Sequence, residues 1–418
     1  MIQCHCSEPA IRSQAGCWRK CMEARPNYRR TLKACYLGFV TQAISANFAP
    51  LLFLTFRSQY GISLERIALI PTLFFFTQLI TDFICAKFVD RIGYRFSVVL
   101  SEVLSSAGLI GMACLPELLP DPFIGILACV VVYAVGSGLI EVLVSPIVEA
   151  CPFDNKEGVM SLVHSFYCWG SAAVILLSSL FFAIFGVSSW KILTCLWALI
   201  PLYNIVNFAV CPIEHLVEDG KSMTILQLFR LPLFWLLALL MVCSGAAELS
   251  MAQWASAFAE AALGVSKTIG DLAGPCFFAI VMGLSRVFYS RKSETLQLEN
   301  YMTGCAALCV ICYLTAALIP SPVVGLIGCA LTGITVGVMW PGTISISSKA
   351  CPRGGTAMFA LLALAGDLGG TLGPLTVGEF SALAGENLRM GILAAAVFPA
   401  VLIAGLMILK KMKKQETA

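Results

Sequence analysis

Long apolar runs separated by short polar turns fill almost the whole chain of 418 residues. Twelve of these runs hold about 18 residues or more, the length that a helix needs to cross the hydrocarbon core of a bilayer. The pattern therefore predicts an all-α membrane protein with twelve transmembrane helices. The predicted spans cover residues 32–55, 67–86, 97–115, 123–150, 158–186, 190–211, 232–261, 268–289, 298–318, 322–349, 354–384 and 388–410.

The spans fall into two groups of six around one long polar connector. Matches recur between the groups at an offset of 200 residues, since Ala150-Cys151-Pro152 returns as Ala350-Cys351-Pro352, and Gly170 returns as Gly370. Such repetition predicts two pseudo-symmetric six-helix bundles. The predicted segments are an N-terminal tail (1–31), a first bundle (32–211), the connector (212–231), a second bundle (232–411) and a C-terminal tail (412–418).

The composition and the charge distribution agree with this reading. Hydrophobic residues make up 59% of the chain and charged residues only 12%, about half the share of a soluble domain. With both termini in the cytoplasm, 22 of the 27 Lys and Arg residues fall on the inner side, as the positive-inside rule requires. We expect a monomer in the lipid bilayer of the plasma membrane. Basic clusters interleaved with aromatic residues do not occur, so we expect no nucleic-acid partner.

The 19 cysteines are scattered through the spans and predict no disulfide framework. Four of them gather with His5 near the N-terminus, at a spacing that matches no standard zinc pattern. We therefore predict no metal and no cofactor. This tail could also lie outside the native protein, with Met22 as the true start. The clustered cysteines are Cys4, Cys6, Cys17 and Cys21.

Four ionisable residues inside predicted spans are the candidates for proton coupling: Glu141, Asp367, Glu248 and His164. A charged side chain at this depth costs roughly 2.5 to 3.5 kcal/mol on insertion scales, so it normally faces a bundle interior or a water-filled cavity. Desolvation favours the neutral carboxyl, which could take up a proton on one side of the membrane and release it on the other. Glu141 is the first choice for this role. The alternative is a buried polar contact that only holds helices together.

Amide and aromatic side chains on other spans are candidates for substrate binding. Amides can hydrogen-bond hydroxyl groups, and flat rings can cover the apolar face of a sugar, although aromatic residues in membrane helices are more often packing or lipid contacts. The candidates are Gln42, Asn47, Tyr167, Gln253, Trp254 and Trp340. We find no Arg or Lys at mid-span, because Arg286 is placed at the end of its helix. We therefore expect a neutral rather than an anionic substrate.

The turn after the second predicted span, Ala86-Lys87-Phe88-Val89-Asp90-Arg91-Ile92-Gly93-Tyr94-Arg95, resembles the signature of the major facilitator superfamily. Asp90, Arg91, Gly93 and Arg95 match it, whereas Ala86 and Tyr94 depart from it. The resemblance implies a latch in which the acid caps a helix and the bases pair with acids of the other half. Glu149 and Lys349, each preceding a repeated Ala-Cys-Pro, are further gating candidates. The alternative is a solvated basic turn.

Within that superfamily, the fourth and fifth spans resemble the fucose-proton symporter subfamily. Gly138-Leu139-Ile140-Glu141 is similar to its glycine-then-glutamate pattern, and His164-Ser165-Phe166-Tyr167-Cys168-Trp169-Gly170 occupies the place of its helix 5 motif. The subfamily associates proton chemistry with an acid on helix 1, and the first span here carries none. Fucose itself is therefore not implied.

These features predict a secondary active transporter that moves a small polar solute, a sugar above all, across the plasma membrane by alternating access coupled to protons. A drug or metabolite efflux transporter of the same fold is the main alternative. A non-transporting membrane sensor is a second alternative. We expect no enzymatic activity, because the chain shows no nucleophile with a recognisable base and no phosphate-binding loop.

Overall fold

The computed structural model describes residues 27–216, 222–256, 260, 264, 267–385 and 387–416. Most of the predicted N-terminal tail, with its cysteine and histidine cluster, and residues 217–221 of the connector lie outside the described residues. Within the described part, all regular elements are helices. The first half holds α2 (Tyr28–Leu51), α3 (Phe53–Tyr60), α4 (Leu64–Ile92), α5 (Tyr94–Leu118), α6 (Pro122–Ala150), α7 (Lys156–Phe185), a 3-10 turn (Val187–Ser189) and α8 (Trp190–Val210).

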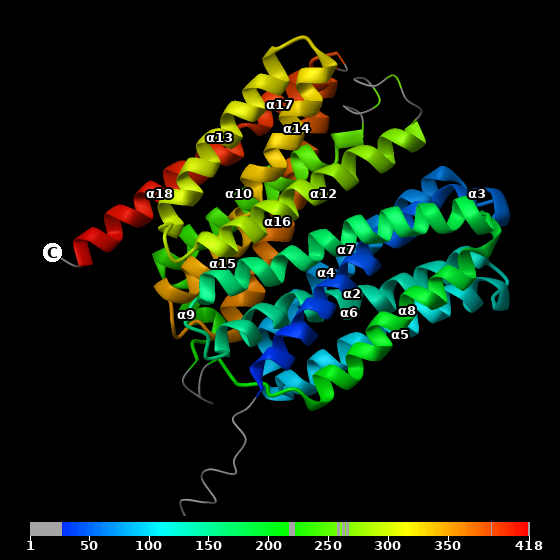
Figure 1. The fold of residues 1–418 in the computed structure, drawn as a ribbon, viewed down its shortest axis with the longest axis horizontal. Coiled ribbons are helices and arrows are strands. Elements are labelled where there is room, and N and C mark those ends of the chain that lie inside the picture. The colour runs from blue at the N-terminus through cyan, green and yellow to red at the C-terminus, as the bar shows by residue number, and fades with distance from the viewer. Residues whose placement is uncertain are drawn as a thin grey trace, which may run out of the picture.

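The second half follows a short helix in the connector, α9 (Ile225–Phe229), and repeats the plan of the first. It holds α10 (Pro232–Ala252), α12 (Lys267–Lys292), α13 (Leu298–Leu318), α14 (Pro322–Val336), α15 (Met339–Ala350), α16 (Gly355–Leu383), α17 (Leu388–Ala395) and α18 (Val397–Glu416). The repeated Ala-Cys-Pro marks matching helix ends, since α6 ends at Ala150 and α15 ends at Ala350. An all-α membrane protein of two helical bundles is thus confirmed (Figure 1).

Ten of the described helices are long and apolar enough to cross a membrane, or up to 11 if the bent pair α2 and α3 forms one span. That pair bends by 47° next to Pro50, which lacks the N–H of a regular helix. Helix α12, with 26 residues, lies where the eighth span is predicted. The twelve predicted spans therefore correspond closely, although not one to one, to the observed helices.

The two halves meet along several pairs of helices. Helix α7 packs against α12, and α4 and α6 pack against α16. Within the second half, glycines let α10 and α16 approach closely: a Cβ atom added at Gly369 would lie 2.0 Å from the carbonyl oxygen of Val242. Facing helices from both halves therefore surround the centre of the molecule.

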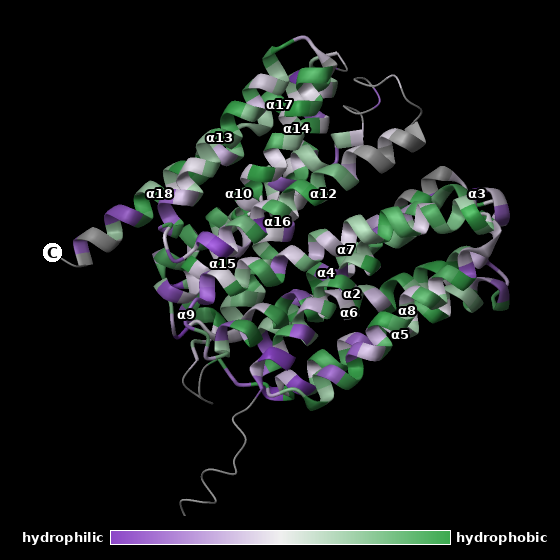
Figure 2. Cartoon of the chain, viewed as in Figure 1, coloured by the Kyte–Doolittle hydropathy of each residue, from purple (hydrophilic) through white to green (hydrophobic). Residues whose placement is uncertain are grey.

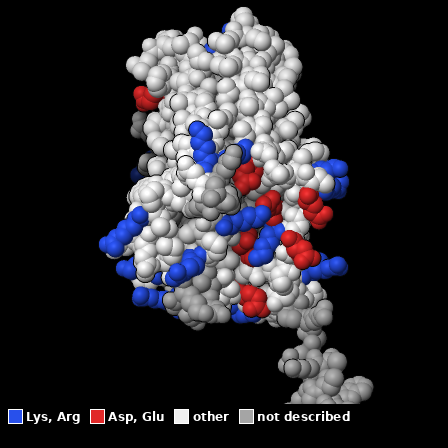
Figure 3. All heavy atoms as spheres, turned by 90° about the vertical axis from the view of Figure 1, so that its left-hand side faces the viewer, with Lys and Arg blue, Asp and Glu red and all other residues white. Residues whose placement is uncertain are grey.

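One end of the molecule carries the connector and the turns at Gly93, at residues 151–155 and at residues 351–354, and we name it the connector face. Hydrophilic residues gather at this end, around α9, while the middle of the long helices is mostly hydrophobic (Figure 2). A view of one side shows the charged side chains gathered in its lower part and few in its upper part (Figure 3). This separation agrees with the charge bias of the sequence.

Candidate functional site

A cavity of about 140 Å³ lies between the two halves, in the region where α4, α6 and α7 face α10, α12 and α16. Both halves contribute polar and ionisable side chains to its wall. The lining residues are Phe39, Gln42, Ala46, Phe74, Phe75, Gln78, Ser137, Glu141, His164, Tyr167, Gly245, Glu248, Leu249, Arg286, Trp340 and Asp367. Seven of the ten coupling and substrate candidates from the sequence are in this set.

Glu141 on α6 and Asp367 on α16 come together across the boundary between the halves. Gln78 on α4 connects them, because its amide Nε2 donates to Glu141 and, over 3.3 Å, to Oδ2 of Asp367. Gln42 on α2 donates a second amide hydrogen bond to Glu141, with an Nε2–Oε2 distance of 2.8 Å. One carboxylate is therefore held by two amides and linked to a carboxylate of the other half.

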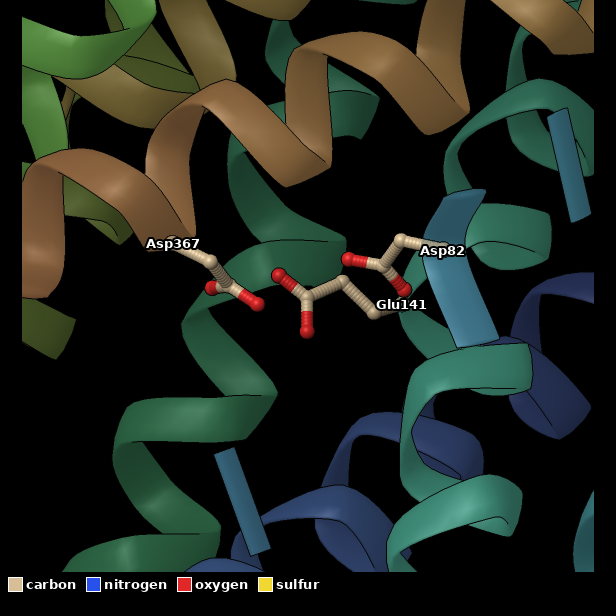
Figure 4. A group of neighbouring side chains, drawn as sticks. All are labelled: Asp82, Glu141 and Asp367. Atoms are coloured by element: carbon tan, nitrogen blue, oxygen red, sulfur yellow. The ribbon is translucent and has the colours of Figure 1, made fainter. Parts of the chain in front are cut away.

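A third carboxylate, Asp82 on α4, completes this cluster. One ligand oxygen from each of Asp82, Glu141 and Asp367 lies within 4.8 Å of the others (Figure 4). Two unit charges about 4 Å apart repel by roughly 4 kcal/mol at an effective dielectric constant of 20. The cluster is therefore poised to take up positive charge.

Arg286 corrects one expectation from the sequence. It does not lie at the end of its helix away from the centre but lines the cavity, with 3% of its surface exposed. Its guanidinium pairs with Glu248 over 3.4 Å and donates to the backbone oxygens of Gly337 and His164, at 2.8 Å each. The expected absence of a central basic residue is therefore wrong.

The sequence explains why one of these backbone oxygens is free. Pro341 has no N–H, so it cannot bond the carbonyl of Gly337 four residues earlier, and the span is broken between α14 and α15 at this point. Arg286 Nε fills the vacant position. The guanidinium thereby joins α12 to α14–α15 in its own half and to α7 in the other half.

His164 lies in the cavity wall with its Nε2 atom 3.1 Å from the hydroxyl of Ser145. Its ring packs against Phe39, with ring centres 4.6 Å apart. Tyr167, one helical turn further along α7, and Trp340 also line the cavity. The indole of Trp340 packs on α16 at Gly366, where a Cβ atom would lie 2.2 Å from its ring.

Three substrate candidates lie outside the cavity lining. Asn47 donates to the carbonyl of Ala43 and to the hydroxyl of Ser171, at 2.9 and 3.1 Å. Gln253 is exposed, and Trp254 is half-buried with no hydrogen-bond partner for its indole nitrogen among the described residues.

The halves are joined at the connector face by a second set of contacts. Glu157, in the first turn of α7, accepts hydrogen bonds from Lys349 on α15 and, over 2.8 Å, from the hydroxyl of Tyr289 on α12. Tyr94 pairs with Thr356 across the same boundary. The gating candidate Glu149 pairs with Lys156 of its own half, at 3.7 Å, and also interacts with Ser348 and Lys349 of the second half.

The signature turn has a different arrangement from the implied latch. Gly93 adopts φ +94°, a backbone conformation that favours glycine, and ends α4. Arg95 donates to the carbonyl oxygens of Phe208 and Ala209, at 3.0 and 2.8 Å, in the last turn of α8 within its own half. Asp90 and Arg91 are exposed and form no ion pair with any residue that the structure describes.

Sequence reasoning missed three acids. Asp82, on the second span, belongs to the central carboxylate cluster but was not among the candidates. Glu157 lies in the first turn of α7, just outside the predicted span, where an acid is common. Glu102 is fully buried in α5 and accepts hydrogen bonds from Thr41 and Asn204, at 2.9 and 2.7 Å. Glu102 could have been noticed as the single acid in an apolar span. It lies inside the first half and not in the cavity.

Comparisons with known proteins agree with this architecture. The profile of the Major Facilitator Superfamily matches residues 34–374. A search of curated proteins finds no match. A solved structure of FucP, the fucose:proton symporter of E. coli, in the outward conformation is similar with a TM-score of 0.77 at 16% identity, over 90% of this chain and 98% of that chain.

Two further solved structures are similar. The proton:xylose symporter XylE gives a TM-score of 0.77 at 12% identity, over 90% of this chain and 94% of that chain. The human organic anion transporter MFSD10 gives 0.69 at 15% identity, over 91% and 100%. The helical fold, with a polar cavity between two bundles, is that of a membrane transporter. The family match establishes that the chain belongs to the Major Facilitator Superfamily.

Proposed function

We propose that this protein moves a small neutral polar solute, a sugar above all, across the plasma membrane by alternating access coupled to protons. The observation that carries the proposal is the central cavity, in which carboxylates from both halves are joined through the amide of Gln78. Bundles 32–211 and 232–411 would rock around it, with both termini in the cytoplasm.

The charge balance of the cavity supports a neutral solute. Glu141, Glu248 and Asp367 line it together with Arg286, so acids outnumber the guanidinium. Arg286 already donates to Glu248, to two backbone oxygens and to the Cys168 sulfur, so four of its five N–H groups have acceptors. Little of its charge is left to hold an anionic substrate.

The hydrogen-bonding groups of the wall suit a hydroxylated ring. Gln42 and Gln78 present amides, His164 and Tyr167 present an imidazole and a phenol, and Trp340 presents a flat apolar surface. Two of the similar structures are of proton symporters for fucose and xylose, which agrees with this choice of solute and of coupling ion.

The coupling step that we propose is protonation of Glu141. A proton there removes the repulsion between Glu141 and Asp367 and leaves the hydrogen bonds from Gln42 and Gln78 possible. The contacts of Glu157 and Tyr94 would hold the connector face closed until the cavity is loaded.

The test is uptake of a panel of sugars into proteoliposomes under an imposed pH gradient, with Glu141→Gln compared to the parent. Glu102→Gln is the matched control, because Glu102 is a buried glutamate on another span that lies outside the cavity. We expect the first variant to lose gradient-driven accumulation and the control to keep it. Unchanged accumulation in Glu141→Gln would remove Glu141 from the mechanism and make Asp367 the next candidate.

The same assay, extended to amphipathic drugs, separates the alternatives. Transport of amphipathic drugs with no response to sugars would identify an efflux transporter. Specific binding of a solute without any flux would identify a sensor.

A further inference from the structure

Asp82 is an ionisable residue of the centre that the proposed proton step does not use. Its surface exposure is 0%, and it is not part of the cavity lining. Neither of its carboxylate oxygens has a hydrogen-bond partner among the described residues. An ionised carboxylate buried without a partner costs several kcal/mol, so Asp82 is stabilised either by a proton or by a positively charged occupant.

The carboxylate of Asp82 is directed into the cluster with Glu141 and Asp367 (Figure 4). The three ligand oxygens lie within 4.8 Å of one another, so a point exists that is no more than about 2.8 Å from every one of them. Oxygen ligands of Ca²⁺ lie at about 2.3 to 2.6 Å, and the cluster reaches this range with shifts of a few tenths of an ångström. Magnesium needs a shorter distance of about 2.0 to 2.1 Å and several water ligands.

The space around Asp82 is preserved by a small residue on the facing helix. Gly138 on α6 lies beside it, and a Cβ atom there would be 3.0 Å from Thr81 and 3.3 Å from Oδ1 of Asp82. A larger residue at this position would press against Thr81 and the carboxylate of Asp82. The cluster is therefore a walled position next to the cavity and not a set of acids spread over a surface.

We propose that Asp82, Glu141 and Asp367 form a binding site for a hard inorganic cation, and that this cation is Na⁺. Carboxylate oxygens select hard cations. Two ligands come from α4 and α6 of the first half and one from α16 of the second half, so separation of the halves takes the site apart. A cation released in every cycle is better monovalent than divalent, because a weaker charge is held less tightly.

This choice of ion rests on the proposed alternating access, whereas the existence of the site does not. A proton on Glu141 and a sodium ion in the cluster neutralise the same charges, so they are alternative occupants. The cation would add a direct link between α16 and the helices α4 and α6.

The experiment measures binding of ²²Na⁺ to the purified full-length protein, together with its thermal unfolding in NaCl or choline chloride at constant pH and ionic strength. We expect saturable binding near one ion per chain and a rise of Tm that follows the same saturation curve. Asp82→Asn should abolish both, and Asp367→Asn should weaken the binding at least tenfold. Glu102→Gln should leave both unchanged.

A variant that merely misfolds is recognised in buffer without sodium. There Asp82→Asn should unfold at a temperature equal to or above that of the parent, because it removes a buried charge without a partner. Absence of saturable ²²Na⁺ binding, its persistence in both Asn variants, or stabilisation by Ca²⁺ alone would each overturn the assignment. Sodium binding without sugar transport would refute the proposed function and leave this site intact.

Discussion

Glu157 offers the sharpest test of how the connector face is closed. It is the acceptor shared by Tyr289 on α12 and Lys349 on α15, so one carboxylate of the first half joins two helices of the second. In Glu157→Gln the amide oxygen can still accept from Tyr289, but the charge is lost. The perturbation therefore weakens contacts between the halves while it keeps the size of the side chain.

The free-energy cost of Glu157→Gln follows from how exposed each of its two partners is. Tyr289 is 1% exposed, and a hydrogen bond to a charged acceptor is worth about 1.5 to 3 kcal/mol against about 1 for a neutral one. The Lys349 side chain is 60% exposed, so its pair adds no more than about 1 kcal/mol. If the two losses together come to about 1.4 kcal/mol, the fraction of molecules that are open at the connector face rises about tenfold.

The assay is hydrogen exchange of the amides in α15 and the first turn of α16, where Ser347 and Thr356 are buried. If exchange there proceeds through opening of the connector face, its rate should rise by the same factor of about ten. Glu117→Gln is the matched control, because Glu117 pairs with Lys191 inside the first half. Its exchange at the connector face should equal that of the parent.

A double-mutant cycle with Tyr289→Phe excludes a purely local effect of losing a charge in the first turn of α7. If the shared hydrogen bond matters, the double variant should cost less than the sum of the two single variants. Exchange at α15 that is the same in Glu157→Gln and in the parent would refute this account of the closed face.

Three further predictions concern packing and charge in the fold. Arg286→Gln should lower Tm markedly, because it leaves the charge of Glu248 without its partner. The double variant Arg286→Gln with Glu248→Gln should recover part of this loss, and no recovery would contradict the pairing. Gly369→Ala should destabilise the protein by about 1 to 3 kcal/mol, as measured by thermal unfolding. Gly378→Ala on the same helix is the control: a Cβ atom there would meet no atom within 4 Å, so the change should be neutral or stabilising. Arg95→Gln should lower the free energy of unfolding by about 1 kcal/mol, because it removes hydrogen bonds to the end of α8. It should leave hydrogen exchange at the connector face unchanged. Faster exchange there would instead support the latch that the signature implies.

Much of the candidate site could be predicted because a charge in a span is costly wherever the helix lies. Glu141, Asp367, Glu248 and His164 were selected on this ground, and the structure places all four in the wall of one cavity. Asn47, Gln253 and Trp254 were selected on residue type alone, which does not say toward which neighbour a helix face turns.

Arg286 shows where reasoning along a single helix fails. Its distance from the helix end suggested the membrane boundary, but the acceptors that stabilise it lie on other helices: the carbonyl of Gly337 freed by Pro341, the carbonyl of His164, and Glu248. No spacing within α12 records these partners. The absence of a central basic residue was therefore predicted wrongly.

The sequence by itself determined the approximate limits of most spans, the charge bias between their ends and the helices that carry acids, because lipid imposes these features on each segment separately. Only the tertiary structure decided which side chains meet. The packing of helices far apart in the chain brings Asp82 into the carboxylate cluster and lets Gln78 donate to Asp367. The same packing makes Glu157 a link between the halves. Helical periodicity gives the face on which a residue lies, but the partner opposite that face is set by the packing of the whole bundle.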